Sequence, residues 1–183
     1  MKRIALTNLL LLFVTIDLYA WDITNSVGGR TNSLGKCSVA LSDFWSLQNN
    51  PAGFATRKDL SIGISYGNRF LLKELSNKDA GILLPINIGT IGISFSQFGY
   101  EHYNENLFGL GLSRSFGQNL RIGLKLYYMS IRFSEEYENR SVPTFDLGIQ
   151  YQINKSLCLG AYIFNPINVR IGSLNKDKVP IIM

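Results

Sequence analysis

The sequence predicts an all-β protein, an antiparallel transmembrane β-barrel with a short N-terminal plug segment that contains a small helix. Three observations predict this class: an export leader, a series of segments in which apolar residues alternate with small or polar ones, and connections that alternate between short and long. The predicted parts are a signal peptide over residues 1–20, a plug segment over 21–59 and barrel strands over 60–183.

The composition is compatible with a barrel and excludes several other classes. The 183 residues suit one domain, and apolar runs of about 20 residues are not found beyond the N-terminus, so a helical membrane protein is not expected. A barrel wall conceals its hydrophobicity from averages, because only every second residue faces lipid. The net charge of +5 comes from scattered basic residues without the clusters of a nucleic-acid surface, so we expect no nucleic-acid partner.

The first 20 residues have the three parts of a secretory signal peptide. Lys2 and Arg3 supply the positive start, residues 4–16 form the apolar stretch, and Ala20 is the small residue before the cleavage point. Asp17 near the end of the apolar stretch argues against a retained membrane anchor. The chain is therefore expected to leave the cytoplasm.

Seven segments after residue 59 alternate with period two, which is the signature of strands with one apolar face. An eighth, over 179–183, looks cut short. The opposite face is mostly glycine and serine with few charges, which suits a narrow lumen where neighbouring walls come close. The seven segments lie at 60–66, 80–86, 91–96, 108–113, 120–128, 145–151 and 157–163.

The connections favour a membrane barrel over a soluble sandwich, which shows the same alternation. Outer-membrane barrels have short turns on one side and longer polar loops on the other. Tyr66, Tyr128 and Tyr151 fall near strand ends, where aromatic girdles lie, and Arg114 can extend into the lipid headgroups. The predicted short turns are 87–89, 117–119 and 154–156, and the predicted longer loops are 99–105, 133–143 and 166–178.

The incomplete eighth strand bears on how the barrel closes. An unpaired strand edge in lipid leaves backbone groups without partners, at several kcal/mol each. We favour a fragment of a longer barrel, because the pattern stops without a terminal aromatic residue. The alternative is that segments such as 69–75 or the N-terminus help to close the barrel.

Residues 28–54 do not follow the strand pattern and are expected to form the plug. Ser42 and Asp43 can cap the start of a short helix that runs through Gln48. The following Asn50-Pro51 ends the helix, and Gly53 permits a turn. Such a segment is either a structural plug packed in or under the barrel or a movable hatch.

Several stretches carry a resemblance to a known family, above all Asn49-Asn50-Pro51-Ala52-Gly53, with 28–30, 38–43, 45–47, 69–71 and 96–100. With these the chain resembles the PorV/PorQ proteins of Bacteroidetes type IX secretion, which are similar to the FadL family of hydrophobic-compound transporters. The resemblance covers most of the mature chain. It implies an outer-membrane barrel whose N-terminal segment enters the lumen, in a family whose members are longer and differ between secretion and small-molecule uptake.

Three ionisable residues that face inward, Arg121, Lys125 and Asp146, are the candidates for a polar site in the lumen. They either pair across the lumen, which we favour, or form a constriction that selects solutes. One histidine, the isolated Cys37 and Cys158, and loop acids without a fixed spacing give no catalytic or metal-binding constellation. We therefore expect no enzymatic activity, no cofactor and no metal.

Two functions and a purely structural role remain for a protein of the bacterial outer membrane. The first function is that of an accessory of protein secretion or cell-surface assembly, with outer-membrane lipid and secretion-system proteins as partners. The second is FadL-like transport of a hydrophobic small molecule. A long apolar lumen would favour transport, whereas the predicted inner face is Gly, Ser, Tyr and a few charges, so the accessory function is favoured.

Overall fold

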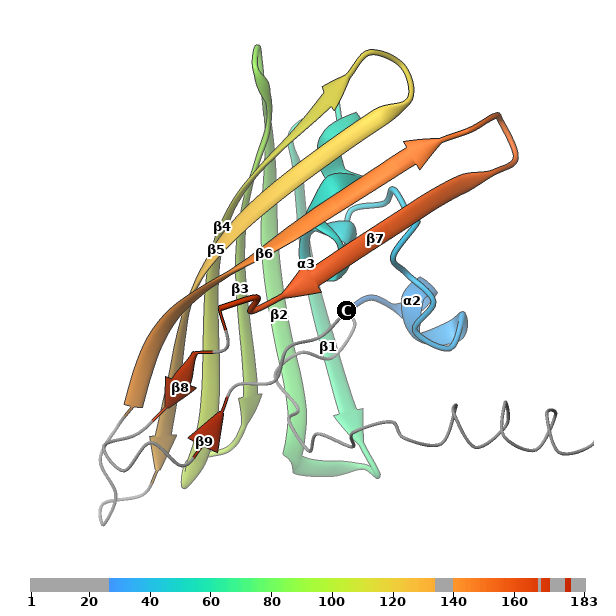
Figure 1. The fold of residues 1–183 in the computed structure, drawn as a ribbon. Helices are drawn as coiled ribbons and strands as arrows, with labels where there is room; N and C mark the ends of the chain where they lie inside the picture. The colour runs from blue at the N-terminus through green and yellow to red at the C-terminus, as the bar shows by residue number, and fades with distance from the viewer. Residues whose placement is uncertain (1–26, 134–139, 168, 172–176, 179–183) are drawn as a thin grey trace, which may run out of the picture.

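A computed structural model describes residues 27–133, 140–167, 169–171 and 177–178, so the predicted signal peptide and eighth strand lie outside the described residues. Seven antiparallel strands, each hydrogen-bonded to its neighbours in sequence order, form one sheet that curls into half of a barrel (Figure 1). The predicted all-β class and the seven strands are confirmed. The strands are β1 (Ser61–Arg69), β2 (Leu72–Ile86), β3 (Gly89–Gly99), β4 (Tyr103–Phe116), β5 (Leu120–Phe133), β6 (Arg140–Gln152) and β7 (Cys158–Phe164), with a separate pair β8 (Arg170–Ile171) and β9 (Asp177–Lys178).

Most strands are longer than the apolar alternation predicts, and the connections are correspondingly shorter. The predicted loop 99–105 shrinks to three residues between β3 and β4, and the predicted loop 133–143 shrinks to six between β5 and β6. Residues 69–75 do not close the barrel; they form the turn and the start of the β1–β2 hairpin. The reason is that a backbone ladder continues through polar strand ends, where hydrophobic periodicity gives no signal. The connections on the predicted short side have two, three and five residues, and those between the seven strands on the other side have two, three and six, so the predicted contrast between short turns and long loops is wrong for this part of the chain.

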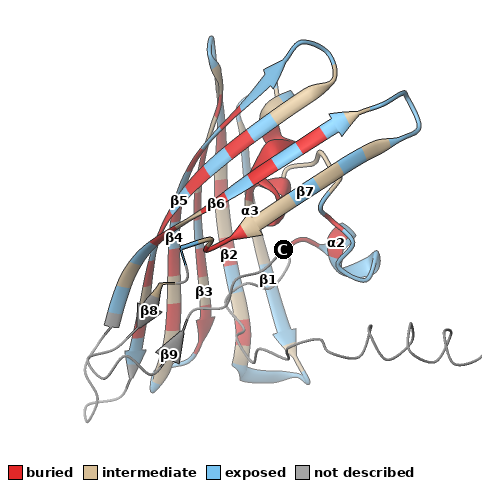
Figure 2. Cartoon of the chain, in the orientation of Figure 1, coloured by how far each residue is buried: buried red, intermediate tan, exposed pale blue. Residues whose placement is uncertain are grey.

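The two faces of the sheet are the reverse of those in a soluble protein. Along β5, Leu124 and Leu126 point outward and are 43% and 55% exposed, whereas the alternating Lys125 and Met129 point inward and are fully buried. Figure 2 shows the same banding along the neighbouring strands. A soluble sheet places its apolar face inside. The outward face is therefore an apolar surface that the described chain leaves uncovered.

The outward side chains form continuous rows across the strands. An aromatic row runs through Phe95, Phe108 and Tyr128, which are cross-strand partners in register. The next row toward the connection between β3 and β4 is polar, and the Tyr128 hydroxyl donates to Ser141 Oγ of that row at 2.8 Å. The polar row consists of Lys78, Gln97, Asn106, Ser130 and Ser141, each paired with the next. An aromatic row beside a polar boundary is the arrangement found at a membrane–water interface.

The outward stretch that contains the apolar rows is somewhat shorter than the apolar band of an outer-membrane barrel, which is about 25 Å tall. Outward residues of β4 from Phe108 to Phe116 cover about 26 Å along the strand at ~3.3 Å per residue. A strand tilt of ~40° reduces this to about 20 Å along a barrel axis, near the apolar band of outer-membrane barrels. Arg114 lies inside this stretch with its guanidinium 5.4 Å from the Phe116 ring centre, at the strand end that was predicted to reach the headgroups.

The N-terminal segment packs on the inner face of the sheet (Figure 1). It contains α2 (Gly29–Ser33), α3 (Ser46–Asn49) and the 3-10 helix η1 (Pro51–Thr56). Of the two residues predicted to cap this helix, Ser42 does not, because its hydroxyl bonds to Gln150 of the wall, whereas Asp43 Oδ1 accepts from the amide of Ser46, the first residue of α3. No helix among the described residues is long and apolar enough to cross a membrane.

Candidate functional site: the interface between plug and wall

The plug, which we define as residues 27–59, rests on a row of glycines. Each of the seven strands contributes one inward-facing glycine near the plug, and three neighbouring pairs are in direct register: Gly63 with Gly81, Gly92 with Gly111, and Gly123 with Gly148. We call this set, completed by Gly160 on β7, the glycine belt. A Cβ atom at six of the seven would collide with plug atoms, and Gly111 instead faces Lys125. The small inner residues therefore make room for the plug and not, as predicted, for an opposing wall.

Asn50 lies at the centre of the plug and is completely buried. Its Nδ2 donates to the Val39 carbonyl at 2.6 Å and to the Ala161 carbonyl of β7 at 3.4 Å, and its Oδ1 accepts from the Ala52 amide at 3.0 Å. The same oxygen occupies the space where a side chain at Gly148 would lie. Asn50 thus caps η1, ties two plug segments together and anchors them to the wall.

The other residues of the predicted motif also have defined places. Asn49 bonds through its amide group to Val27 and Thr31 and so fixes α2 against α3. The Pro51 carbonyl lies over Gly123, and the Ala52 carbonyl accepts from Ser113 Oγ of β4 at 3.3 Å. A side chain at Gly53 would strike the Leu41 carbonyl and Ser46, so a glycine is needed where these segments meet. The motif is the joint that holds the plug together and to the wall.

Arg121 belongs to a clamp on the plug near the connection between β4 and β5. Its Nη1 donates to Ser42 Oγ at 2.7 Å, and Ser42 in turn donates to Gln150 Oε1 at 2.9 Å. The Gln150 amide nitrogen donates to two plug carbonyls, those of Val39 at 3.0 Å and Leu41 at 2.9 Å. One wall arginine and one wall glutamine therefore hold three residues of the plug, at and just after the turn over residues 38–41.

Lys125 reaches the plug from the middle of the wall. Its Nζ donates to the Leu47 carbonyl at 2.5 Å and to Gln48 Oε1 at 2.8 Å, and it lies 4.5 Å from the Tyr127 ring centre. The Gln48 amide nitrogen donates to Ser96 Oγ at 2.8 Å, and Ser96 donates to Asp79 Oδ1 at 2.7 Å. The chain from Lys125 to Asp79 crosses from β5 to β2 by way of the plug.

Asp146 sits opposite Lys125 in the β5–β6 register, yet its carboxylate has other partners. Its Oδ2 accepts from the hydroxyls of Tyr127 and Tyr162, each at 3.0 Å, while among the described residues Oδ1 has no hydrogen-bond donor. The three predicted lumen residues are thus close along the wall but do not form one constriction. Arg121 and Lys125 bind the plug, and Asp146 joins two tyrosines.

Sequence reasoning missed Gln48, Gln150 and the pair Asp79 and Ser96. A signal for three of them was available, because Gln150, Asp79 and Ser96 occupy inward positions of predicted or extended strands. Gln48 was assigned to the helix, with no indication that its side chain faces the wall. Its role depends on the docking of the plug, which the period of the strands does not encode.

The inner face has a second, apolar region at the end of the sheet remote from the plug. Leu107, Tyr127, Met129, Ile131 and Phe164 form a buried cluster there, with Tyr103, Val142 and Tyr162 packed against it. The predicted inner face of Gly, Ser, Tyr and a few charges therefore describes only the plug half. The cluster was missed because β5 extends past Tyr128, where the predicted strand ends.

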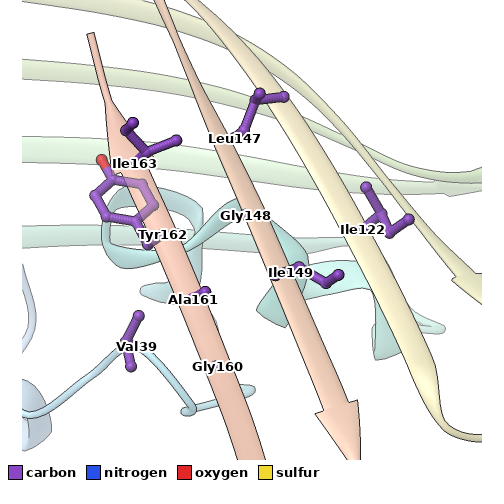
Figure 3. A pocket seen from close by; sticks show the side chains of 9 residues that line it. All are labelled: Val39, Ile122, Leu147, Gly148, Ile149, Gly160, Ala161, Tyr162 and Ile163. Carbon is purple, nitrogen blue, oxygen red and sulfur yellow. The ribbon is translucent and has the colours of Figure 1, made fainter. Parts of the chain in front are cut away.

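Two apolar grooves lie where outward residues meet. The larger, about 670 Å³, is on the β6–β7 side, and Figure 3 shows its lining by Ile122, Leu147, Ile149, Ala161 and Ile163, with Val39 of the plug beside the edge of β7. The smaller, about 270 Å³, lies over β2 to β5. Both are lined largely by the outward rows and are therefore apolar.

The remaining reactive groups do not gather. Cys37 is exposed and Cys158 half-buried, and neither is in a disulfide. His102 packs edge-on against Tyr100, and Glu105, predicted in a loop, lies buried in β4; residues 135, 136 and 138 lie outside the described residues. The described part of the chain has no group of three or more His, Cys, Asp or Glu side chains placed to hold a metal ion.

No family model, curated protein or solved structure matches the chain.

Proposed function

We propose that the chain forms part of the wall of a bacterial outer-membrane β-barrel and acts as an accessory of protein secretion or cell-surface assembly. The observation that carries the membrane location is the reversal of the two faces. Outward residues such as Ile64, 84% exposed, form apolar rows bounded by aromatic and polar rows, while charged groups such as Lys125 face inward. Exposed apolar surface of this extent is unstable in water and suits lipid.

The plug supports an accessory function over passage of a solute. Its residues lie against six of the seven glycines of the belt and bond to the wall through Asn50, Arg121, Lys125 and Gln150. A lumen occupied by the plug in this way offers surfaces for binding partner proteins and no open path for a solute. The resemblance to PorV/PorQ proteins points in the same direction, with secretion-system proteins as partners at the connections.

FadL-like transport of a hydrophobic molecule is the alternative, and one observation favours it. The inward cluster around Leu107, Met129 and Ile131 makes the inner face apolar beyond the plug, with these side chains packed against one another. A hydrophobic solute would bind there by displacing this packing.

The test uses a deletion strain of the native host, complemented with the full chain or left without it. We expect the deletion to lower the amount of protein secreted to the cell surface, measured by quantitative mass spectrometry, with uptake of a radiolabelled long-chain fatty acid unchanged. Loss of fatty-acid uptake with a normal surface proteome would establish the alternative. Membrane location is read separately, by whether the chain stays in the outer-membrane fraction after an alkaline wash.

A further inference from the structure

One charged side chain lies among the apolar rows on the outward face of the sheet. Arg114 of β4 alternates with the outward Leu112 and Phe116 and is exposed. Between the polar row and the strand ends at the β2–β3 and β4–β5 turns, it is the only outward residue of the seven described strands with a formal charge. It lies one row inside the last outward row, which contains Phe116 and Tyr151. A cation at this position in lipid is unfavourable unless it reaches water or an anion.

The guanidinium group of Arg114 has no anionic partner among the described residues. Neither a carboxylate nor another oxygen of the described chain accepts a hydrogen bond from it, and its contact is with the Phe116 ring, whose centre lies 5.4 Å from Arg114 Cζ. A guanidinium presents five N–H donors in a planar fork that fits the oxygens of a phosphate or a carboxylate. Arg114 is therefore positioned by an aromatic ring while its donors stay available to an anion.

A notch in the outward face lies directly beside Arg114. Gly89 is the first residue of β3 and shares the outward alternation of Ile91, so this outward position has no side chain. A Cβ atom at Gly89 would lie 3.4 Å from Arg114 Cβ and would collide with the carbonyl oxygen of Ser113. The surface next to the cation is therefore open at this point.

The smaller of the two apolar grooves, about 270 Å³, adjoins this notch. Its lining includes Ile88, the residue before Gly89, and Leu112, two residues before Arg114. From there the groove extends to Leu126 on β5. A hydrocarbon chain that lies in a groove contacts side chains on both flanks and so gains more dispersion contacts than on a flat surface.

We propose that Arg114, the notch at Gly89 and the adjoining groove form a binding site for one anionic phospholipid, with its phosphate on the guanidinium group and an acyl chain in the groove. The order of the features carries the inference, because a single cation stands at the end of an apolar channel, as an anionic head stands at the end of an acyl chain. Anionic phospholipids are constituents of membranes. This inference rests on the proposed membrane location, because only there does the outward face meet lipid.

The first test counts the lipids that the purified full chain retains. The native chain and Arg114→Gln are extracted in a neutral detergent that contains equal amounts of phosphatidylglycerol and phosphatidylcholine with the same acyl chains, and bound lipids are counted by native mass spectrometry. Arg132→Gln is the matched control, because Arg132 is exposed on β5 at the opposite end of the sheet. We expect Arg114→Gln to bind phosphatidylglycerol roughly tenfold more weakly than the native chain, the loss typical of a hydrogen bond to a charged group, and Arg132→Gln to bind it equally well.

The second test fills the groove without changing charge, and it carries the proposal if Arg114→Gln does not fold. Leu112→Trp places a large apolar side chain in the groove, and Leu147→Trp is its control on an outward row outside this groove. We expect Leu112→Trp to weaken phosphatidylglycerol binding by roughly fourfold, the equivalent of one buried methylene group, and Leu147→Trp to leave it unchanged.

Three results would overturn the proposal. The first is equal retention of the two lipids by the native chain, and the second is an equal loss of binding in a variant and its control. The third is displacement of phosphatidylglycerol by an equimolar amount of oleate, which would assign the site to a fatty acid. An alkaline wash separates these failures from failure of the proposed function: a chain that leaves the outer-membrane fraction contradicts the membrane location, whereas a chain that stays there without selecting phosphatidylglycerol contradicts the lipid site alone.

Discussion

The space on the inner side of the sheet is filled differently in the two halves of the wall. Under the plug, the inward positions are mainly the glycine belt, a few polar side chains and Leu83, and the plug supplies most of the bulk. At the other end, Leu107, Met129 and Ile131 fill the space from the wall itself. Along β5 the change occurs within a few residues, from Gly123 to Met129. The inward residues of the wall are therefore small where the plug packs against them and large where the wall fills its own interior.

The two regions also differ in the interactions that hold them. The plug is held by hydrogen bonds to side chains of the wall, which water can replace, and by an apolar contact of Leu47 and Phe54 with Leu83 of the wall, while the cluster around Met129 is held mainly by burial within the wall. Changes to the cluster should therefore affect the wall, and changes to the belt or its clamps should affect the plug.

The largest expected effect is on the apolar cluster. Met129→Ala removes a fully buried side chain and should lower the free energy of unfolding by roughly 2–5 kcal/mol, the range for Met-to-Ala changes in cores. The protection of residues 27–59 from added protease, measured well below the unfolding midpoint in detergent, should not change. Early cleavage of the plug in this variant would contradict the separation of the two regions.

The next effect is on the glycine belt. Gly123→Val places a side chain where the Pro51 backbone lies, and overpacking of this kind costs roughly 1–3 kcal/mol. Since valine favours strands, the wall itself should not weaken, and the loss should appear as protease cleavage of the plug. Gly67→Val is the matched control, because Gly67 faces open space on β1. Equal cleavage of the two variants would show that the belt does not seat the plug.

The contrast between Gly63 and Gly67 also shows where sequence reasoning stops. Both are strand glycines four residues apart in β1, and the local pattern treats them alike, yet only Gly63 lies against Phe44 of the plug. The alternation predicted the strands because it is a local property of each segment. The seat of the plug depends on contacts between residues such as Asn50 and Gly148, which lie about 100 positions apart, so periodicity carries no information about it.

The candidate site was predictable in part for the same reason. The inward positions of Arg121, Lys125 and Asp146 follow from the period of two, but their partners do not. Ser42 was predicted to cap a helix, and it bonds to Gln150 instead, because a wall side chain competes with the local amide. The Asn49–Gly53 motif was singled out by resemblance, and its bonds show why these residues act together.

A smaller effect should follow from loss of the central plug residue. Asn50→Ala leaves the Ala52 amide without its acceptor and the Val39 carbonyl with only one of its two side-chain donors, Gln150. A buried group deprived of its partner costs roughly 1–3 kcal/mol, and the remaining donor places the loss near the lower end. Plug cleavage should therefore be faster than in the native chain and slower than in Gly123→Val. Asn32→Ala, in an exposed position on α2, is the control and should behave as the native chain.

The smallest net effect is expected at Lys125, although its contacts are short and buried. Lys125→Met removes the donor to the Leu47 carbonyl and to Gln48, but it also removes the cost of burying an ammonium group. These terms offset each other, and the neighbouring Asp146 carboxylate keeps its two tyrosine donors, so the free energy of unfolding should change by less than ~1 kcal/mol. Plug cleavage should still accelerate, because the wall keeps its packing while the plug loses a tether. Lys78→Met, in the outward polar row, should leave cleavage unchanged. If Lys125→Met destabilised the wall as much as Met129→Ala, Lys125 would belong to the core of the wall and not to the contacts that hold the plug.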